Sequence, residues 1–450
     1  NPYYRSKDDY EFSNLKFSGN IYTDIKLLKG LNFKTTLNTY IGRADTKNHD
    51  AVDLLMGPSG FAPGNVASSA DKVVSYTWDN LLTYNLNVEG HSLNLLLGYE
   101  DNNINRYRFT AERRNYANDN FPYLNAGGII YGAGDQASMT RLVSYFSRLG
   151  YNYSGKYFIT AQFRRDGSSR FGPNSKWGNF PSLSVAWSIT QEPFMRAVES
   201  VLNDLRLRAS YGFTGNDNFS DYAWISTMGQ AKVSLGNNLL MSSYPNSLAN
   251  PDSKWERTRQ LNIGVDIGLW RNRLMIDANA YNSTSNDLLL NVPVPATSGF
   301  QNVFTNIGKI QNNGFDISIS SRNLVNKLKW TTQVTFSTNK SKVLQMGPDG
   351  SPLFNNLNGG MLAANIIGKD LFSFFAYNYI GVYMSQDELD KDPSAYSTAK
   401  PGDGKYEDVN RDGKLDADDR KVIGKNTPDF IYGMTNTFTY GNFDFSFLIN

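Results

Sequence analysis

Residues 205–213 decide the fold class of this chain. They read Leu205-Arg206-Leu207-Arg208-Ala209-Ser210-Tyr211-Gly212-Phe213, so apolar and polar side chains alternate at almost every step. Successive side chains of a β-strand point to opposite faces, and this period of two therefore predicts a strand with one apolar and one polar face. We expect Arg206 and Arg208 on the polar face, opposite Leu205 and Leu207.

The same alternation recurs from one end of the chain to the other. Examples are Leu82/Tyr84/Leu86/Val88, Leu93/Leu95/Leu97/Tyr99, Leu261/Ile263/Val265/Ile267/Leu269, Leu328/Trp330/Thr332/Val334/Phe336 and Phe443/Phe445/Phe447/Ile449. Many of these runs are about 9–11 residues long, the length that a tilted strand needs to cross a bilayer. The sequence predicts an all-β fold with about 14 strands.

The connections between these runs are of two kinds. Short turns are expected near residues 28–30, 89–91, 154–156, 271–273, 324–326 and 441–442, whereas long polar stretches lie near 43–73, 102–139, 166–178, 214–257, 284–310 and 340–428. On the short side, residues 192–202 have Pro193 near their start and the pattern of a brief amphipathic helix. Tight turns on one side and long loops on the other are typical of outer-membrane barrels. We predict a transmembrane antiparallel β-barrel with short periplasmic turns and long extracellular loops.

The charge balance and the missing residue types exclude several functional classes. Lys and Arg total 44 and Asp and Glu total 42, a net charge of +2, whereas a nucleic-acid binder needs a basic face. The chain has no cysteine, and its two histidines are His49 and His91. Disulfides and thiolate metal sites are therefore excluded within this chain, and a multi-histidine metal site or histidine-based catalysis is almost excluded. We expect no enzymatic activity.

Aromatic residues are the strongest compositional signal, with 27 Tyr, 27 Phe and 7 Trp. Tyr and Trp favour the headgroup level of a bilayer, where one end of the ring system is apolar and the other is wet. No apolar run approaches the length of about 18 residues that a membrane helix needs. A barrel is compatible with this, because its strands alternate between lipid and a polar lumen. The predicted location is the outer membrane of a Gram-negative cell.

Residues 408–419 fit the template of a calcium-binding loop. Oxygen donors stand at positions 1, 3, 5, 9 and 12, and Gly413 at position 6 permits the sharp turn. Asp419 replaces the usual bidentate Glu, and its shorter side chain would weaken binding. The alternative is an acidic loop closed by its own hydrogen bonds and ion pairs. The candidate Ca²⁺ ligands are Asp408, Asn410, Asp412, Lys414 (through its backbone carbonyl), Asp416 and Asp419.

Two groups of arginines carry further expectations. Arg164, Arg165 and Arg170 surround a polar turn and could bind an anion, but we favour a loop with internal ion pairs. Arg206 and Arg208 are predicted to face the lumen. A charge at the bilayer midplane on the lipid face costs about 2–4 kcal/mol, so Leu207→Arg should impair membrane assembly whereas Arg206→Ala and Arg208→Ala should not.

Five segments, in order along the chain, resemble the SusC/RagA family of TonB-dependent outer-membrane transporters. Each is weak by itself, and their shared order makes the resemblance strong. It covers most of residues 10–450. The segments are Arg164–Gly172 with Trp177–Ser182, Leu205–Gly212 with Thr214–Asn216, Asn250–Glu256 with Gln260–Asp266, Asn306–Gly308 with Asn313–Asp316, and Asp408–Gly424.

The resemblance implies a 22-stranded barrel filled by an N-terminal plug, of which residues 1–450 would be a single partial barrel domain. We expect the plug, a TonB box, a signal peptide and the remaining strands to lie outside this chain. Members of the family import oligosaccharides or peptides with TonB-transmitted energy, together with a SusD-like surface lipoprotein. The resemblance therefore implies a nutrient importer, with outer-membrane lipid around it and no nucleic-acid partner.

Two alternatives from other functional classes remain open. The first is a surface-exposed adhesion barrel whose loops bind a partner without transport. The second is a secreted, calcium-dependent, carbohydrate-active β-protein. A plug-coding region upstream would favour transport over adhesion, and a monomer that is soluble without detergent would favour the secreted protein.

Overall fold

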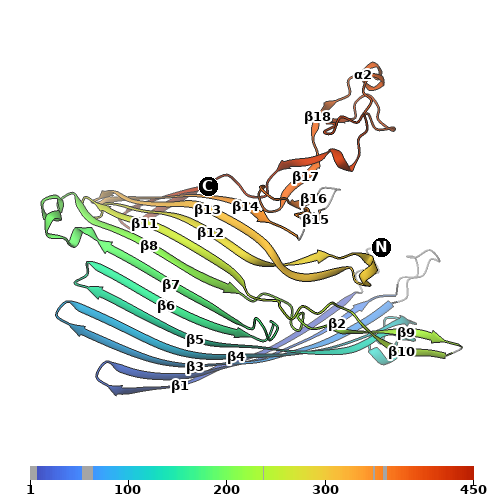
Figure 1. The fold of residues 1–450 in the computed structure, drawn as a ribbon, viewed down its shortest axis with the longest axis horizontal. Helices are drawn as coiled ribbons and strands as arrows, with labels where there is room; N and C mark the ends of the chain where they lie inside the picture. The colour runs from blue at the N-terminus through green and yellow to red at the C-terminus, as the bar shows by residue number, and fades with distance from the viewer. Residues whose placement is uncertain (1–7, 53–63, 237, 348–349, 358–361) are drawn as a thin grey trace. The chain divides into compact units, whose positions relative to one another are not determined.

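The computed structural model describes residues 8–52, 64–236, 238–347, 350–357 and 362–450 (Figure 1). Fourteen strands form one antiparallel sheet that follows the chain, in the order β1-β2-β3-β4-β5-β6-β7-β8-β11-β12-β13-β14-β21-β22. The prediction of an all-β antiparallel fold with about 14 strands is confirmed. The strands are β1 Asp9–Leu28, β2 Leu31–Asp50, β3 Gly64–Val88, β4 His91–Tyr116, β5 Ile129–Tyr153, β6 Tyr157–Ser168, β7 Trp177–Ser188, β8 Leu202–Asn216, β11 Glu256–Leu269, β12 Leu274–Pro293, β13 Asn302–Val325, β14 Leu328–Gln345, β21 Ile431–Tyr440 and β22 Phe443–Ile449.

Smaller elements occupy two of the long connections. Between β8 and β11 lies the hairpin of β9 (Met228–Leu235) and β10 (Asn238–Pro245). Between β14 and β21 lie a four-stranded sheet, a two-stranded sheet and a short helix. These are β15 Leu353–Asn356, β16 Leu362–Asn365, β17 Ser373–Tyr377 and β20 Arg420–Gly424, then β18 Tyr379–Val382 and β19 Gly404–Tyr406, and α2 Gln386–Lys391. Short 3-10 turns also occur among the described residues: η1 Leu124–Ala126, η2 Ile189–Gln191, η3 Pro193–Val198, η4 Ala296–Ser298 and η6 Ala417–Asp419.

The short connections lie where the sequence predicts them. Glu89 and Gly90 both have positive φ, 42° and 85°, and so do Ser154 and Gly155, at 53° and 69°. Two successive positive φ values give the type I′ geometry, whose twist matches that of the flanking strands. The predicted helix after Glu192 is present as the 3-10 helix η3, which begins at Pro193.

Most strands are longer than the hydrophobic pattern predicts. β2 to β5 have 20 to 26 residues each, so much of the stretches 43–73 and 102–139 is strand rather than loop, and residues 284–310 lie largely in β12 and β13. The pairing of β3 with β4 continues from Val88↔His91 to Gly64↔Tyr116. In their outer halves both faces of these strands carry polar side chains, so the alternation fades while the backbone pairing continues. The long connections that remain are 217–255 and 346–430.

The chain groups into two compact units. The first comprises Asn1–Tyr151, Gln162–Asn179 and Asp217–Asp252, and the second comprises Asn152–Ala161, Phe180–Asn216 and Ser253–Asn450. In the first unit, Val52, Val66 and Tyr116 form a small buried cluster at the outer ends of β2 to β4, with Leu124 packed against it.

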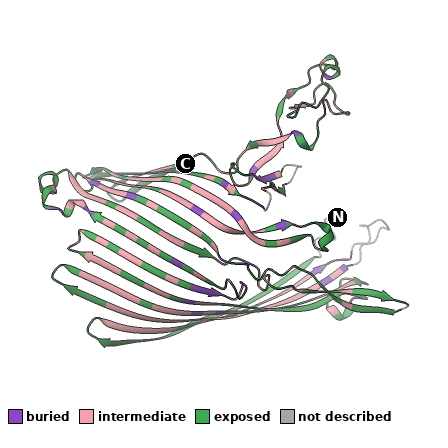
Figure 2. Cartoon of the chain, in the orientation of Figure 1, coloured by how far each residue is buried: buried purple, intermediate pink, exposed green. Residues whose placement is uncertain are grey.

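The strands bury few side chains, and Figure 2 shows them mostly in the intermediate and exposed classes. Many of the exposed side chains are large and apolar: Leu183 is 50% exposed, Leu207 44% and Ile263 57%. Exposed apolar surface on this scale is unusual beside water and indicates contact with another apolar phase. In the described part of the chain, no helix is both long enough and apolar enough to cross a membrane.

Candidate functional site

The two faces of the sheet differ in chemistry. On β7, Trp177, Leu183, Val185 and Trp187 point to one face by the alternation of the strand, and we call it the aromatic face. Ser182, Ser184 and the other intervening residues point to the opposite face, which we call the polar face. Each face carries a distinct arrangement of side chains.

An outer row of rings crosses the aromatic face in the first unit. Trp78 of β3 contacts Tyr99 of β4 with 5.9 Å between ring centroids, Tyr99 contacts Tyr145 of β5 at 5.3 Å, and Tyr145 contacts Trp177 of β7 at 6.1 Å. Trp177 reaches across β6 because Gly167 lies beneath it: a Cβ there would be 2.8 Å from the indole ring. These separations are typical of favourable ring contacts.

The aromatic face of β4 changes in character at this row. Leu93, Leu95 and Leu97 precede Tyr99 on the same face, and Asp101 follows it. Asp101 is 5% exposed and accepts two hydrogen bonds from Arg141, at 2.9 and 2.8 Å. Apolar, aromatic and ionic side chains therefore succeed each other toward the outer end of the strand, as at the edge of a membrane.

An inner row of rings lies in the second unit, beside the short turns. Tyr153 stacks on Tyr157 at 6.4 Å, and Tyr157 stacks on Trp187 at 6.3 Å. Glu192, in the turn after β7, accepts hydrogen bonds from the Tyr157 hydroxyl at 2.6 Å, from Lys156 Nζ at 3.1 Å and from Trp187 Nε1 at 3.2 Å. The bonds from Tyr157 and then Lys156 lower the pKa of Glu192, so this carboxylate is ionised and holds the polar ends of both rings.

The length of β7 between its two tryptophans fits the thickness of a bilayer. Trp177 and Trp187 are ten residues apart on β7. At about 3.4 Å per residue and a strand tilt of about 35–45°, ten residues of a strand span about 26 Å along the membrane normal. The apolar band of an outer-membrane barrel is about 25 Å tall, with an aromatic girdle at each edge.

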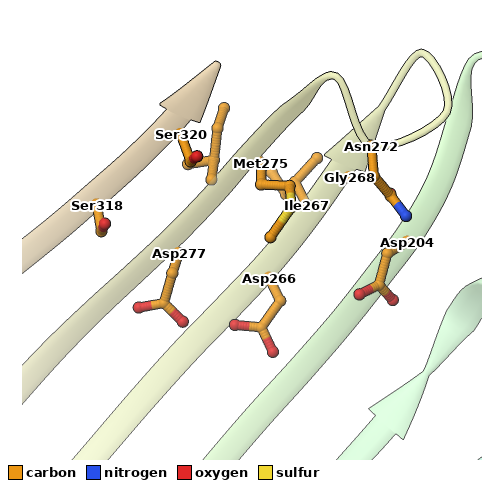
Figure 3. Close-up of a pocket in the computed structure, with 10 residues that line it drawn as sticks. Asp204, Asp266, Ile267, Gly268, Asn272, Met275, Asp277, Ser318 and Ser320 are labelled. Atoms are coloured by element: carbon orange, nitrogen blue, oxygen red, sulfur yellow. The ribbon is translucent and has the colours of Figure 1, made fainter. Parts of the chain in front are cut away.

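The polar face of the second unit carries an arginine held by two carboxylates. Arg208 donates to Asp266 at 2.9 and 2.6 Å and to Asp277 at 2.5 Å. Asp204, Asp266 and Asp277, from β8, β11 and β12, line one hollow of about 380 Å³ (Figure 3). Arg206 lies on the same face, with its guanidinium 5.7 Å from the Phe158 ring centroid. The structure thus brings both predicted arginines to the polar face.

The three arginines near residue 167 do not converge on one anion site. Arg164 lies on the polar face and donates to Asp166 at 2.7 Å and to Ser144 at 2.8 Å. Arg170 donates to Asp221 at 3.0 Å, and Arg165 lies on the aromatic face, 5.2 Å from the Trp177 ring centroid. The preferred interpretation of internal ion pairs therefore holds for Arg164 and Arg170. Arg165 has a different environment.

The loop 408–419 closes on its own backbone. Asp408 accepts from the N–H groups of Arg411 and Gly413, at 2.6 and 2.9 Å, and Asp419 accepts from those of Val409 and Asp416, at 2.9 and 2.8 Å. The bond from the Asp416 N–H is the main cause of the lowered pKa of Asp419. Across the described residues, no three His, Asp or Glu side chains are grouped so that they could hold a metal ion. Calcium binding by Asp408, Asn410, Asp412, Lys414, Asp416 and Asp419 stays a prediction.

A two-faced antiparallel sheet whose apolar face carries rows of Tyr and Trp side chains is typical of a β-barrel protein of the outer membrane. A family model described as "TonB dependent receptor-like, beta-barrel" matches residues 1–445. The chain belongs to this TonB-dependent receptor family, and the prediction of a SusC/RagA-like barrel located in the outer membrane is confirmed.

Individual relatives agree with this membership. TonB-dependent receptor P3 of Formosa agariphila is 33% identical over 95% of this chain and 43% of its own length. TonB-dependent receptor SusC of Bacteroides thetaiotaomicron is 28% identical over 98% of this chain and 43% of its own length. A chain from the structure of the RagAB peptide transporter superposes with a TM-score of 0.83 at 23% identity, over 98% of this chain and 48% of that one. This chain therefore spans less than half the length of these relatives.

Family membership also bears on the other functional predictions. The family is one of receptors and transporters rather than enzymes, and its members lie in the outer membrane. The alternative of a secreted carbohydrate-active protein does not agree with that location.

The two aromatic rows and Glu192 are not among the residues that the sequence singles out. The excess of Tyr and Trp signals rows of this kind, but the strand register is needed to place them.

Proposed function

We propose that this chain forms part of the wall of an outer-membrane importer, with its polar face lining the passage and its aromatic face against lipid. The difference between the two faces of the sheet carries this proposal. An ionised group at the midplane of the lipid face costs about 2–4 kcal/mol, whereas a water-filled lumen accepts it. Arg208 with its two aspartates, and Arg164 with Asp166, therefore belong on the lumen side.

The lumen would suit a polar, hydrogen-bonding solute. The hollow beside Asp204, Asp266 and Asp277 also includes Ser318 and Ser320, so it offers carboxylate and hydroxyl oxygens. Such groups accept hydrogen bonds from sugar hydroxyls, peptide N–H groups and ammonium groups alike. We infer an oligosaccharide or a peptide as the class of substrate, in line with the RagAB peptide transporter, whose fold this chain shares.

The proposed importer acts with partners that lie outside this chain. We propose a SusD-like surface lipoprotein as its extracellular partner, and TonB as its energy source through an N-terminal part of the whole receptor. Likeness to SusC and to the RagAB peptide transporter supports both proposals. The proposed roles of this chain are to form the passage and to hold the loops that meet the lipoprotein.

Thiol labelling tests the assignment of the faces, and residues 1–450 contribute no cysteine of their own to the background. Ser184→Cys and Ser210→Cys, on the polar face, should react with a charged, membrane-impermeant maleimide in intact outer membranes. Leu183→Cys and Val185→Cys, their neighbours on the aromatic face, should react only after the membrane is dissolved in detergent. Equal labelling of all four positions in intact membranes would overturn the assignment.

Uptake measurements test the transport proposal. Cells with the gene deleted should lose growth on one class of nutrient, either oligosaccharides or peptides, and loss of TonB should have the same effect. The lipoprotein should co-purify with the receptor in mild detergent. Surface binding of a ligand or cell without TonB-dependent uptake would instead support the adhesion barrel.

A further inference from the structure

A hollow opens on the aromatic face just inside the outer row of rings, in the first unit. Its walls are Leu97, Tyr145, Phe163 and Trp177, and Ser147 forms part of its floor. The four wall side chains are between 41% and 51% exposed. The volume of about 580 Å³ lies within the range of about 300–1,000 Å³ that is usual for small-molecule sites. Its lining is mainly apolar, so it fits a hydrocarbon group.

One cation stands at the outer rim of this hollow. Arg165 lies over the ring of Trp177, with 5.2 Å from its guanidinium carbon to the ring centroid, and it is exposed. Arg164, the preceding residue, is paired with Asp166 and Glu100 on the other face. In the part of the chain that the structure describes, Arg165 has no such carboxylate partner. The hollow therefore combines an apolar interior with an uncompensated positive charge at its edge.

The depth of Arg165 matches the headgroup level of the outer leaflet. An arginine on the lipid face costs little near the interface and far more at the midplane. Arg165 lies level with the outer row, next to Trp177, where its charge meets headgroups. A second cation follows the same pattern in the other unit, where Arg257 at the outer end of β11 lies 4.0 Å from the Phe213 ring centroid.

We propose that this hollow is a binding site for a phosphorylated lipid of the outer leaflet. One acyl chain occupies the space between Leu97, Phe163 and Trp177, and the phosphate accepts hydrogen bonds from Arg165. A guanidinium presents a planar fork of donors that matches phosphate geometry, and its cost of desolvation is low. The site is continuous with the lipid-facing surface, so the proposal rests on the proposed orientation of the two faces.

Two substitutions separate the headgroup contact from the acyl-chain contact. Arg165→Gln removes the charge, and Ser147→Phe fills the floor of the hollow. Arg148→Gln is the matched control, because it removes a charge from the same region but from the polar face of β5. Arg165→Lys retains the positive charge but loses the planar, forked set of hydrogen-bond donors of the guanidinium group.

The measurement is native mass spectrometry of the whole receptor, purified from outer membranes and delipidated in mild detergent. It is titrated with a monophosphorylated lipid A and with the same lipid lacking its phosphate. We expect Arg165→Gln to weaken binding of the phosphorylated lipid about tenfold, equivalent to about 1.4 kcal/mol, and to leave the other lipid unaffected. Ser147→Phe should weaken both, Arg165→Lys should lose less than Arg165→Gln, and Arg148→Gln should match the wild type.

Three outcomes would overturn the proposal. They are an unchanged affinity in Arg165→Gln, an equal loss in Arg148→Gln, and full competition by millimolar inorganic phosphate, which would indicate a simple anion site. Heat-modifiable mobility on gels confirms that each variant is folded. Thiol labelling reports independently on the orientation of the faces, so a failure of that assignment is distinguishable from a failure of the lipid site alone.

Discussion

Replacing Leu183 by arginine is the most direct test of the proposal that the aromatic face of the sheet contacts lipid. Leu183 lies six residues from Trp177 and four from Trp187 on β7. With a rise of about 2.6 Å per residue along the membrane normal, it is about 16 Å along β7 from the level of Trp177 and about 10 Å from that of Trp187. Leu183 is therefore close to the middle of the apolar band, with its side chain half exposed on the aromatic face.

An arginine at this depth should cost about 2–4 kcal/mol, which changes the folding equilibrium by about 30-fold to 900-fold. Ser182→Arg is the matched control. Ser182 is the neighbouring residue on the polar face, and it pairs with Gly212, which has no side chain to obstruct a longer one. The control should cost less than about 1 kcal/mol, because its charge enters a water-filled lumen.

The assay is reversible unfolding in urea from phospholipid vesicles, followed by Trp fluorescence and by heat-modifiable mobility. A third variant calibrates depth. Leu207 pairs with Trp187 and so lies at the inner row, where an arginine should cost only about 0–1 kcal/mol. The sequence suggests Leu207→Arg as the test of lipid exposure. The structure makes Leu183→Arg the more sensitive test, because Leu183 lies nearer the middle of the apolar band. Equal losses in Leu183→Arg and Ser182→Arg would refute the reasoning.

Three further predictions concern the charged groups. Arg208→Ala should lower the unfolding free energy by about 1–2 kcal/mol, because Asp266 and Asp277 lose their donor and the partial exposure of Arg208 limits the effect. Urea unfolding measures this free energy, and an unchanged value would contradict the prediction. The pKa of Glu192 is lowered, so its stabilising contribution is complete above the ordinary value of about 4.3 and is lost as the pH falls through the lowered value. Glu192→Gln should abolish that acid-dependent loss in thermal melts, and an unchanged acid profile would argue against the role of this carboxylate. Calcium at millimolar concentration should raise the melting temperature of the wild type and release heat in calorimetry, but not in Asp419→Asn; identical behaviour of the two would end the idea of a calcium loop.

The sequence predicts those parts of the fold that lie in the membrane. Alternation over residues 205–213 and 261–267 places the side chains of these segments of β8 and β11 on the faces where the structure has them. The prediction fails in the outer halves of the strands. The sequence pattern predicts a long loop over residues 102–139, yet residues 102–116 pair with β3 along their whole length. Most side chains are polar on both faces there, so no hydrophobic period marks the strand.

The sequence predicts on which face of the sheet Arg206 and Arg208 lie, but not which residues they contact. Alternation alone places Arg206 and Arg208 together. It does not find Asp266 and Asp277, which are 58 and 69 residues further along the chain. Their proximity to Arg208 depends on the register of β8 with β11 and of β11 with β12, and one sequence does not fix a register. The same holds for the aromatic rows, since each ring comes from a different strand.

The vertical position of the wall is fixed by the strands themselves rather than by the loops. On the aromatic face of β4, Leu97, Tyr99 and Asp101 occupy successive positions for hydrocarbon, headgroup and water. A shift of two residues would move the carboxylate to the headgroup level, and a shift of one would exchange the two faces. At the other edge, Glu192 fixes the inner row through the polar ends of Tyr157 and Trp187. Each row of rings is therefore held by the strands and short turns of its own unit, and neither row depends on the long connections.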